Sequence, residues 1–253
     1  LVKRSIVKHG YDTMAVLRIA CYHPIQHYKL DVGYLQVGQS ADFITVNNLR
    51  DFTVLQTYIK GKVVASEGKT LISSVNNEIV NQFNTSLKKR EDFSLKGTVG
   101  NIQVIQAVDG ELVTKKFEAE AKIVNHCIVS NVEKDILKIA VINRYENAPI
   151  SIAFINGFGL KQGAIASSIA HDSHNIIVVG VNDEEMCAAV NAIIANKGGI
   201  ALSSNEKVDV LPLPVAGIMS DKDGYLVAKS YEAMDKQAKE LGSCLYAPFM
   251  TLS

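Results

Sequence analysis

The chain has 253 residues, of which 47% are hydrophobic and 21% are charged, an ordinary balance for a globular protein. This length permits one large domain or two smaller ones. The 26 basic and 26 acidic side chains cancel to a formal net charge of +0. The balance argues against a protein that binds nucleic acid or an anionic membrane, because contacts with phosphate groups require an excess of basic residues.

Cysteine usage and the lengths of the apolar runs indicate the compartment. The cysteines form no Cys-x-x-Cys pair, which argues against a disulfide scaffold or a zinc ribbon. They are Cys21, Cys127, Cys187 and Cys244. Apolar runs such as 176–181 are too short to span a bilayer, and no signal peptide opens the chain, so we expect a cytoplasmic location. Because the chain begins at Leu1 and ends without a polar tail, we expect it to be part of a longer protein.

Residues 1–29 are predicted to be helical. Asp12 or Thr13 can cap a helix whose apolar residues recur at three- and four-residue spacing. His9-Gly10 is predicted to end the preceding helix, with glycine at the left-handed cap position. His23-Pro24 is predicted to break the second helix and can begin another turn.

Short strands are predicted over residues 30–72. Residues 43–46 have strand character, and residues 54–65 contain two strands joined by a tight turn at Lys60-Gly61. This segment is too short to bury a sandwich core alone, so we expect it to complete a sheet begun elsewhere. Residues 73–98 are polar and are predicted to form a connection with a solvated surface.

Residues 99–253 are predicted to form a mixed α/β domain. A helix is expected after Asn182, which is one of its two candidate caps, and another helix over residues 230–241, closed by Gly242. The apolar, proline-rich run 211–220 is predicted to be a buried or partner-covered loop. The strand candidates are 102–108, 118–124, 136–143, 150–155, 164–169, 176–181 and 199–202.

The densest polar cluster is His171-Asp172-Ser173-His174-Asn175, which lies between two apolar strand candidates. A turn at the end of a sheet can project several functional groups into a cleft, and Asp172 could orient either imidazole. Metal ligation, proton transfer and substrate contact are all open to such a cluster. The alternative is an ordinary hydrogen-bonded turn, because Asp, Ser and Asn favour turns.

Two weaker candidates for ligand contacts lie outside this cluster. Residues 157–163 have the spacing G-x-G-x-x-x-G and precede a strand, so their glycines are predicted to permit positive φ or close approach instead of binding a nucleotide phosphate. Lys161 in this run is a candidate cation for the substrate, with a solvated lysine as the alternative. Arg144 is expected either to contact a ligand or to pair with Glu146 or a neighbouring acid.

Three segments resemble known enzymes. Residues 157–180, GFGLKQGAIASSIAHDSHNIIVVG, look like the carboxy-terminal region of bacterial adenine deaminases, and residues 211–220, LPLPVAGIMS, are similar to the next segment of that family. Residues 32–43, VGYLQVGQSADF, resemble the G-x-I/L-x-x-G-x-x-A-D segment of the metal-dependent amidohydrolase superfamily. In that superfamily the segment marks the return of the chain from the barrel to a small β domain.

The resemblance implies a fold class that combines α/β and α+β parts. Residues 1–29 would be the terminal helices of a (β/α)8 barrel, and residues 30–72 would be returning strands of a small β-sandwich domain. Residues 73–98 would be the connection, and residues 99–253 a shortened carboxy-terminal domain of mixed α/β structure, specific to the family.

The resemblance further implies a parent enzyme that hydrolyses adenine to hypoxanthine and ammonia, in purine salvage and adenine catabolism. Its barrel would hold divalent manganese, iron or zinc, and a metal-bound hydroxide would attack the base. The family's ligands, including a His-x-His pair, lie upstream of residue 1, and no His-x-His occurs here. We therefore expect the chain alone to bind no metal and to lack deaminase activity.

The loop of residues 171–175 is expected to reach the barrel mouth, where the chemistry of such barrels takes place. By this resemblance we assign His171, Asp172 and His174 to catalysis and Ser173, Asn175 and Lys161 to substrate binding. The expected partners are a purine base, the barrel domain and further copies of the chain in a homo-oligomer, without nucleic acid or membrane. The alternatives are another cyclic amidohydrolase and a non-catalytic domain for subunit contacts.

Overall fold

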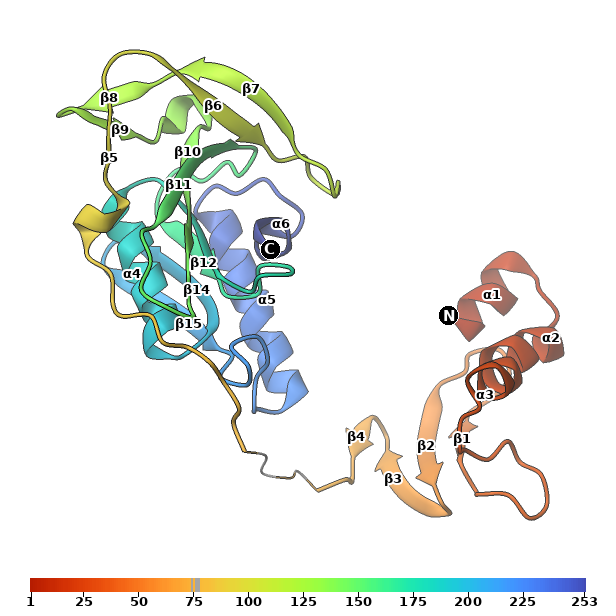
Figure 1. The fold of residues 1–253 in the computed structure, drawn as a ribbon. Coiled ribbons are helices and arrows are strands. Elements are labelled where there is room, and N and C mark those ends of the chain that lie inside the picture. The colour runs from red at the N-terminus through yellow and green to blue at the C-terminus, as the bar shows by residue number, and fades with distance from the viewer. Residues whose placement is uncertain (74, 76–77) are drawn as a thin grey trace. The chain divides into compact units, whose positions relative to one another are not determined.

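In the computed structural model the chain divides into two compact units, residues 1–76 and 77–253 (Figure 1). The structure describes residues 1–73, 75 and 78–253. Within these ranges, no helix has both the length and the apolar content that crossing a bilayer requires.

The first unit begins with helices. They are α1 (Val2–His9), α2 (Thr13–Leu17), a π-helical turn (Arg18–Tyr22) and α3 (His23–Tyr28). As predicted, Gly10 ends α1 with a left-handed φ of 68°, and the Asp12 carboxylate caps α2 by accepting a 2.8 Å hydrogen bond from the N–H of Ala15. His23-Pro24 begins α3, which confirms the predicted new turn, but the helical path is not broken there, because Pro24 lies in the first turn of α3, where its missing N–H costs nothing.

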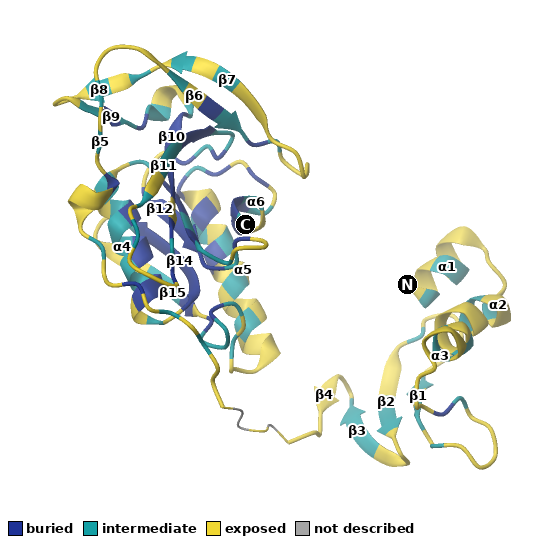
Figure 2. Ribbon diagram, viewed as in Figure 1, coloured by how far each residue is buried: buried dark blue, intermediate teal, exposed yellow. Residues whose placement is uncertain are grey.

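Four antiparallel strands complete the first unit. They are β1 (Phe43–Val46), β2 (Val54–Ile59), β3 (Lys62–Ser66) and β4 (Lys69–Thr70), paired in chain order. The predicted tight turn is present, with positive φ at both Lys60 and Gly61. Among the described residues of this unit only Gly33 is buried, as the scarcity of dark blue in Figure 2 shows. The described part of the first unit therefore builds no apolar core of its own.

One carboxylate organises the loop before β1. Asp42 accepts hydrogen bonds from the backbone N–H groups of Gly33 (2.9 Å) and Lys60 (2.7 Å). Residue 33 has to be glycine, because a Cβ there would lie 1.7 Å from the carbonyl oxygen of Ser40. Asp42 thus ties the start of the loop to the β2–β3 turn, which gives a physical reason for the glycine and the aspartate of the segment 32–43.

An eight-stranded mixed sheet forms the centre of the second unit (Figure 1). Its strand order is β15-β14-β12-β13-β10-β11-β6-β7, and every neighbouring pair is antiparallel except β11 with β6. The strands are β6 (Asn101–Gln106), β7 (Lys115–Glu120), β10 (Leu137–Ile142), β11 (Ser151–Asn156), β12 (Ala164–Ser167), β13 (Ile176–Gly180), β14 (Gly199–Ser204) and β15 (Lys207–Pro212). A smaller sheet contains β5 (Leu95–Lys96), β9 (Cys127–Val129) and β8 (Lys122–Val124).

Helices bury both faces of the middle strands of the central sheet. Helix α4 (Asp183–Ala195) covers one face, and α5 (Gly224–Glu240) and α6 (Pro248–Leu252) cover the other. Side chains alternate between the two cores, so that Ala164 and Ala166 of β12 pack with α4 while Ile165 packs with α5 and α6. Figure 2 shows the middle strands β10, β12, β13 and β14 mostly in dark blue, and the second unit is thus a three-layer α/β/α body.

Most elements predicted for the second unit are present, with shifted ends. Each predicted apolar run contains a strand, and the Asn182 side chain caps α4 by accepting a 2.8 Å hydrogen bond from the N–H of Glu185. Helix α5 begins six residues before its predicted start, because the Asp223 carboxylate caps it. The prediction that 211–220 is entirely loop is wrong, because Leu211 and Pro212 belong to β15. In the predicted connection, Phe93 of the short 3₁₀ helix Arg90–Phe93 is fully buried against the α4 side of the sheet.

A buried ion pair joins the central sheet to α4. Lys138 on β10 is only 1% exposed, and its ammonium group donates to the Asp183 carboxylate (2.5 Å) and to the carbonyl oxygen of Phe93 (2.9 Å). Asp183 lies in the first turn of α4, where the helix dipole also favours a negative charge. The pair therefore connects a strand, a helix and the 3₁₀ helix at one point.

Removing one partner of this pair is expected to destabilise the protein more than removing both. Asp183→Asn leaves a buried ammonium group without its counter-ion and is expected to lower the free energy of unfolding by about 3 kcal/mol. Adding Lys138→Met is expected to recover part of that loss in a double-mutant cycle measured by chemical denaturation. The control is Glu184→Gln, which breaks the exposed ion pair with Arg90 and is expected to cost below about 1 kcal/mol. Additive effects of the Lys138 and Asp183 variants would contradict the coupling.

The Asp42 hydrogen bonds predict a stability that depends on pH. The N–H groups of Gly33 and then Lys60 hold the pKa of the Asp42 carboxyl below its usual value. Its stabilisation is therefore complete above the unfolded pKa of about 3.9 and is lost as the pH falls through the lower folded pKa. Asp42→Asn is expected to lower the thermal unfolding midpoint at pH 7, with an effect that shrinks below about pH 4.

The matched control is Asp31→Asn, which changes an exposed carboxylate in the same loop that makes no hydrogen bond among the described residues. Unfolding midpoints measured between pH 2 and pH 7 should separate the two variants at neutral pH. An equal response of both variants across this range would contradict the role given to Asp42.

Candidate functional site

The sequence cluster of residues 171–175, called the histidine loop below, lies at one end of the central sheet. It belongs to the connection between β12 and β13, which pair as an antiparallel hairpin. Because β13 is antiparallel to both β10 and β12, the last residues of those two strands lie at the same end, where β13 begins. Strand β15 also ends there, since Gly199 at the start of β14 pairs with Pro212. Several connections therefore meet around the histidine loop.

The histidine loop is a turn that contains two backbone hydrogen bonds of its own. The N–H of Ser173 donates to the carbonyl oxygen of His171 (2.9 Å), and the N–H of His174 donates to that of Ala170 (2.7 Å). Asp172 and His174 both have left-handed backbones, with φ of 65° and 49°. Such conformations are unfavourable for residues with a Cβ, although Asp and His tolerate them better than most.

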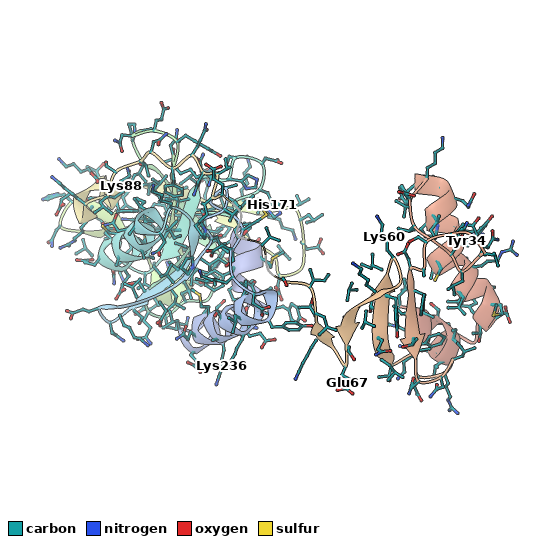
Figure 3. The ribbon with its side chains drawn as sticks, turned by 90° about the horizontal axis from the view of Figure 1, so that it is seen from below. Tyr34, Lys60, Glu67, Lys88, His171 and Lys236 are labelled. Atoms are coloured by element: carbon teal, nitrogen blue, oxygen red, sulfur yellow. The ribbon has the colours of Figure 1, made fainter. Side chains whose placement is uncertain are left out.

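Exposure divides the five side chains of the loop into two groups. His171, Asp172 and Ser173 are exposed, and Figure 3 shows His171 at the periphery of its unit, whereas His174 and Asn175 are half-buried. The Nδ1 atom of His174 is buried and has no hydrogen-bond partner among the described residues. The loop thus offers one open imidazole and one that is partly enclosed.

The expectation that Asp172 orients an imidazole is not met in this conformation. Among the described hydrogen bonds, none joins Asp172 to His171 or His174. The left-handed φ of Asp172 turns the chain sharply at this residue. The tautomers of both histidines are therefore not set by this carboxylate here.

Arg144 and Tyr145, which follow β10, contact the histidine loop. The N–H of Arg144 donates to Oδ1 of Asn175 (3.3 Å), and the Tyr145 hydroxyl donates to the carbonyl oxygen of Ser173 (3.0 Å). The expected pairing of Arg144 with Glu146 is wrong: the guanidinium is only 5% exposed and donates to the carbonyl oxygen of Ala216 and to the Tyr145 hydroxyl. Tyr145 was not singled out by the sequence, since a tyrosine after a strand carries no motif.

The structure does not bring Lys161 together with the histidine loop. Lys161 precedes β12, whereas the histidine loop follows it, and four strand residues separate the two ends by roughly 10–13 Å. Lys161 is exposed, and its N–H donates to the carbonyl oxygen of Leu241 (2.8 Å). The loop that carries it has the predicted positive φ at Gly157, Gly159 and Gly163. There the Asp135 carboxylate accepts hydrogen bonds from the N–H groups of Gly157 and Gly159.

An apolar cavity of about 630 Å³ opens between α5 and the segment after β15. Ile169, two residues before the histidine loop, lines it together with Leu213, Met219 and Tyr231. No side chain of the histidine loop lines this cavity. The cavity and the polar loop are therefore separate features of the same end of the sheet.

The donor set within the described residues does not fit a metal ion. No group of three or more His, Cys, Asp or Glu side chains in those ranges is arranged to hold one. The four cysteines are free, and they lie far apart in the sequence. The two histidines and the aspartate of the histidine loop do not converge on a common point.

Two family models match the chain. The model described as the adenine deaminase C-terminal domain matches residues 111–253, which is more than half of the chain. The model of the amidohydrolase family matches residues 2–64, which include the helices of the first unit and the loop tied by Asp42.

Curated relatives match the chain over its whole length. An adenine deaminase of Sulfurovum sp. (strain NBC37-1) is 51% identical over all of this chain and 46% of its own length. Adenine deaminases of Borreliella burgdorferi and Methanosarcina mazei are each 44% identical over all of this chain, which covers 46% and 48% of their lengths. The chain spans about half the length of the curated relatives it matches.

Proposed function

Because this chain belongs to the adenine deaminase C-terminal domain family, we propose that it forms the carboxy-terminal part of an adenine deaminase. The whole enzyme would hydrolyse adenine to hypoxanthine and ammonia. The observation that carries this proposal is the identity of 44–51% over the entire chain to relatives named adenine deaminase.

The first unit is proposed to complete an amidohydrolase barrel. Residues 1–29 would supply its terminal helices, and residues 30–72 would supply returning strands of the small β domain. Two observations support this assignment: the amidohydrolase model matches residues 2–64, and the described residues of this unit bury only Gly33. Apolar side chains such as Tyr11 and Ile19 are 63% and 62% exposed, which suits helices that pack against a further part of the protein.

The histidine loop is proposed to act on the purine base. Replacing the amino group of a cyclic amidine by water requires protons to be moved to and from nitrogen, and an imidazole does this near neutral pH. His171 is exposed and free to reach a substrate. Ser173 and the Nδ2 donor of Asn175 would contact the polar edge of the base. Lys161 is left outside this site because it lies at the opposite end of β12.

The amidohydrolase family implies a divalent metal in the whole protein. The metal would polarise water for attack on the ring when it is bound. Since the donor set of the described residues does not fit a metal, we assign no ligand in this chain and propose that the chain alone does not turn over adenine.

Asparagine substitutions of the two loop histidines test this role in the full-length protein with its metal. At least one of His171→Asn and His174→Asn is expected to lower kcat with adenine by about 10²–10⁴-fold, the range for loss of a proton-transferring group. Asparagine is chosen because it tolerates the left-handed backbone of His174. Steady-state deamination of adenine is the measurement.

The matched control is His126→Asn, which removes an exposed imidazole from another left-handed position of the same unit, in the turn between β8 and β9. Thermal unfolding checks that all three variants stay folded. Unchanged turnover in both loop variants would overturn the catalytic role of the histidine loop. A full-length protein that ignores adenine under every metal would overturn the assigned reaction.

A further inference from the structure

Arg144 carries a buried positive charge that no described carboxylate neutralises. Arg144 is 5% exposed, and among the described residues no Asp or Glu oxygen lies within 4 Å of its guanidinium. The Nε atom is buried without a hydrogen-bond partner in the same ranges. A charge in such a place is costly, so the other contacts of this guanidinium have to compensate.

Those contacts fix the guanidinium in one position. Nη1 donates to the carbonyl oxygen of Ala216 (2.8 Å), and Nη2 donates to the hydroxyl of Tyr145 (3.1 Å). The guanidinium carbon lies 4.8 Å from the centre of the Tyr145 ring and 5.6 Å from that of Phe83. Gly217 has a left-handed φ of 74°, and a Cβ there would lie 1.7 Å from Nη1, so a larger residue at 217 would displace the guanidinium from this position.

Arg144 and Tyr145 also contact the histidine loop on both sides of His174. The Tyr145 hydroxyl accepts a hydrogen bond from Arg144 and donates one to the carbonyl oxygen of Ser173 (3.0 Å). The backbone N–H of Arg144 donates to Oδ1 of Asn175 (3.3 Å). A cation that donates to a hydroxyl strengthens the hydrogen bond which that hydroxyl donates onward. The buried charge is therefore coupled to the loop through Tyr145.

We infer that Arg144 and Tyr145 are positioning residues that hold the histidine loop in its reactive conformation, an inference that rests on the function proposed above. The loop contains two left-handed residues, Asp172 and His174, and such a backbone persists only where surrounding contacts impose it. The contacts of Arg144 and Tyr145 with Ser173 and Asn175, called the clamp below, impose it from outside the loop. They act on how the imidazoles are presented and do not touch the substrate.

Two substitutions in the full-length protein test the clamp. Tyr145→Phe keeps the ring beside the guanidinium but removes the hydroxyl that joins Arg144 to Ser173. Arg144→Lys keeps the charge, but an ammonium group lacks the planar fork that reaches Ala216 and Tyr145 together. Both variants are expected to lower kcat with adenine about 10²-fold while KM stays within about threefold, because a misplaced reacting group lowers turnover more than binding.

Hydrogen exchange gives a second readout that does not depend on activity. The amides of Ser173 and His174 are bonded within the loop, and in both variants they are expected to exchange about fivefold faster. The matched control is Tyr231→Phe, which removes from α5 a buried hydroxyl that has no hydrogen-bond partner among the described residues. This control is expected to leave exchange in the histidine loop and kcat unchanged.

The outcomes separate the clamp from the proposed function. Unchanged exchange and kcat in Tyr145→Phe, in a protein whose His171→Asn or His174→Asn variant is impaired, would overturn the clamp and leave the proposed function standing. Normal turnover in both histidine variants would overturn the proposed function, and the inference that rests on it, whatever the exchange rates show. If Tyr145→Phe lowers kcat equally when both loop histidines are already asparagine, its effect does not pass through the loop, and the inference is wrong.

Discussion

Burial of both faces of the central sheet is the constraint on which the second unit depends. Helix α4 and the pair α5 and α6 leave no face of the middle strands in water, so these strands carry apolar side chains at nearly every position. The one lysine among them, Lys138, is tolerated because the Asp183 carboxylate and the carbonyl oxygen of Phe93 accept hydrogen bonds from its ammonium group. Polar chemistry can therefore occur only where strands end, and the histidine loop lies at such an end.

Because the middle strands are buried on both faces, the sequence could predict them, whereas the edge of the sheet was harder to predict. Continuous apolar runs predicted the middle strands, and the side-chain oxygens of Asp12 and Asn182 predicted two helix starts, because both signals are local. Strand β15 was largely missed, since its charged residues Lys207 and Asp209 interrupt the apolar pattern at the edge of the sheet. Helix α5 was predicted too short, because Asp223-Gly224 has the composition of a turn and here begins a helix instead.

The sequence could predict the part of the site that is formed by neighbouring residues, but not the contacts from distant segments. The turn at residues 171–175 followed from its composition between two apolar runs, but its supports did not. The Arg144 guanidinium reaches Ala216, 72 residues along the chain, and that contact depends on the space left at Gly217. The separation of Lys161 from the histidine loop likewise follows from the path of β12, which composition does not reveal. In these two cases, the separation of residues along the sequence does not indicate how close they lie in the fold.

Strands β6 and β11 form the one parallel pair described in the eight-stranded sheet, and this pairing affects how the sheet assembles. The strands of this sheet that follow each other in the chain as paired neighbours, β6–β7, β10–β11, β12–β13 and β14–β15, form antiparallel hairpins. Pairing β6 with β11 instead joins two segments that β7, β8, β9 and β10 separate in the sequence. Closing this longer stretch of chain has a higher entropic cost. We therefore expect the hairpins to form early and the β6–β7 arm to dock late, so that slow refolding steps would report on that arm.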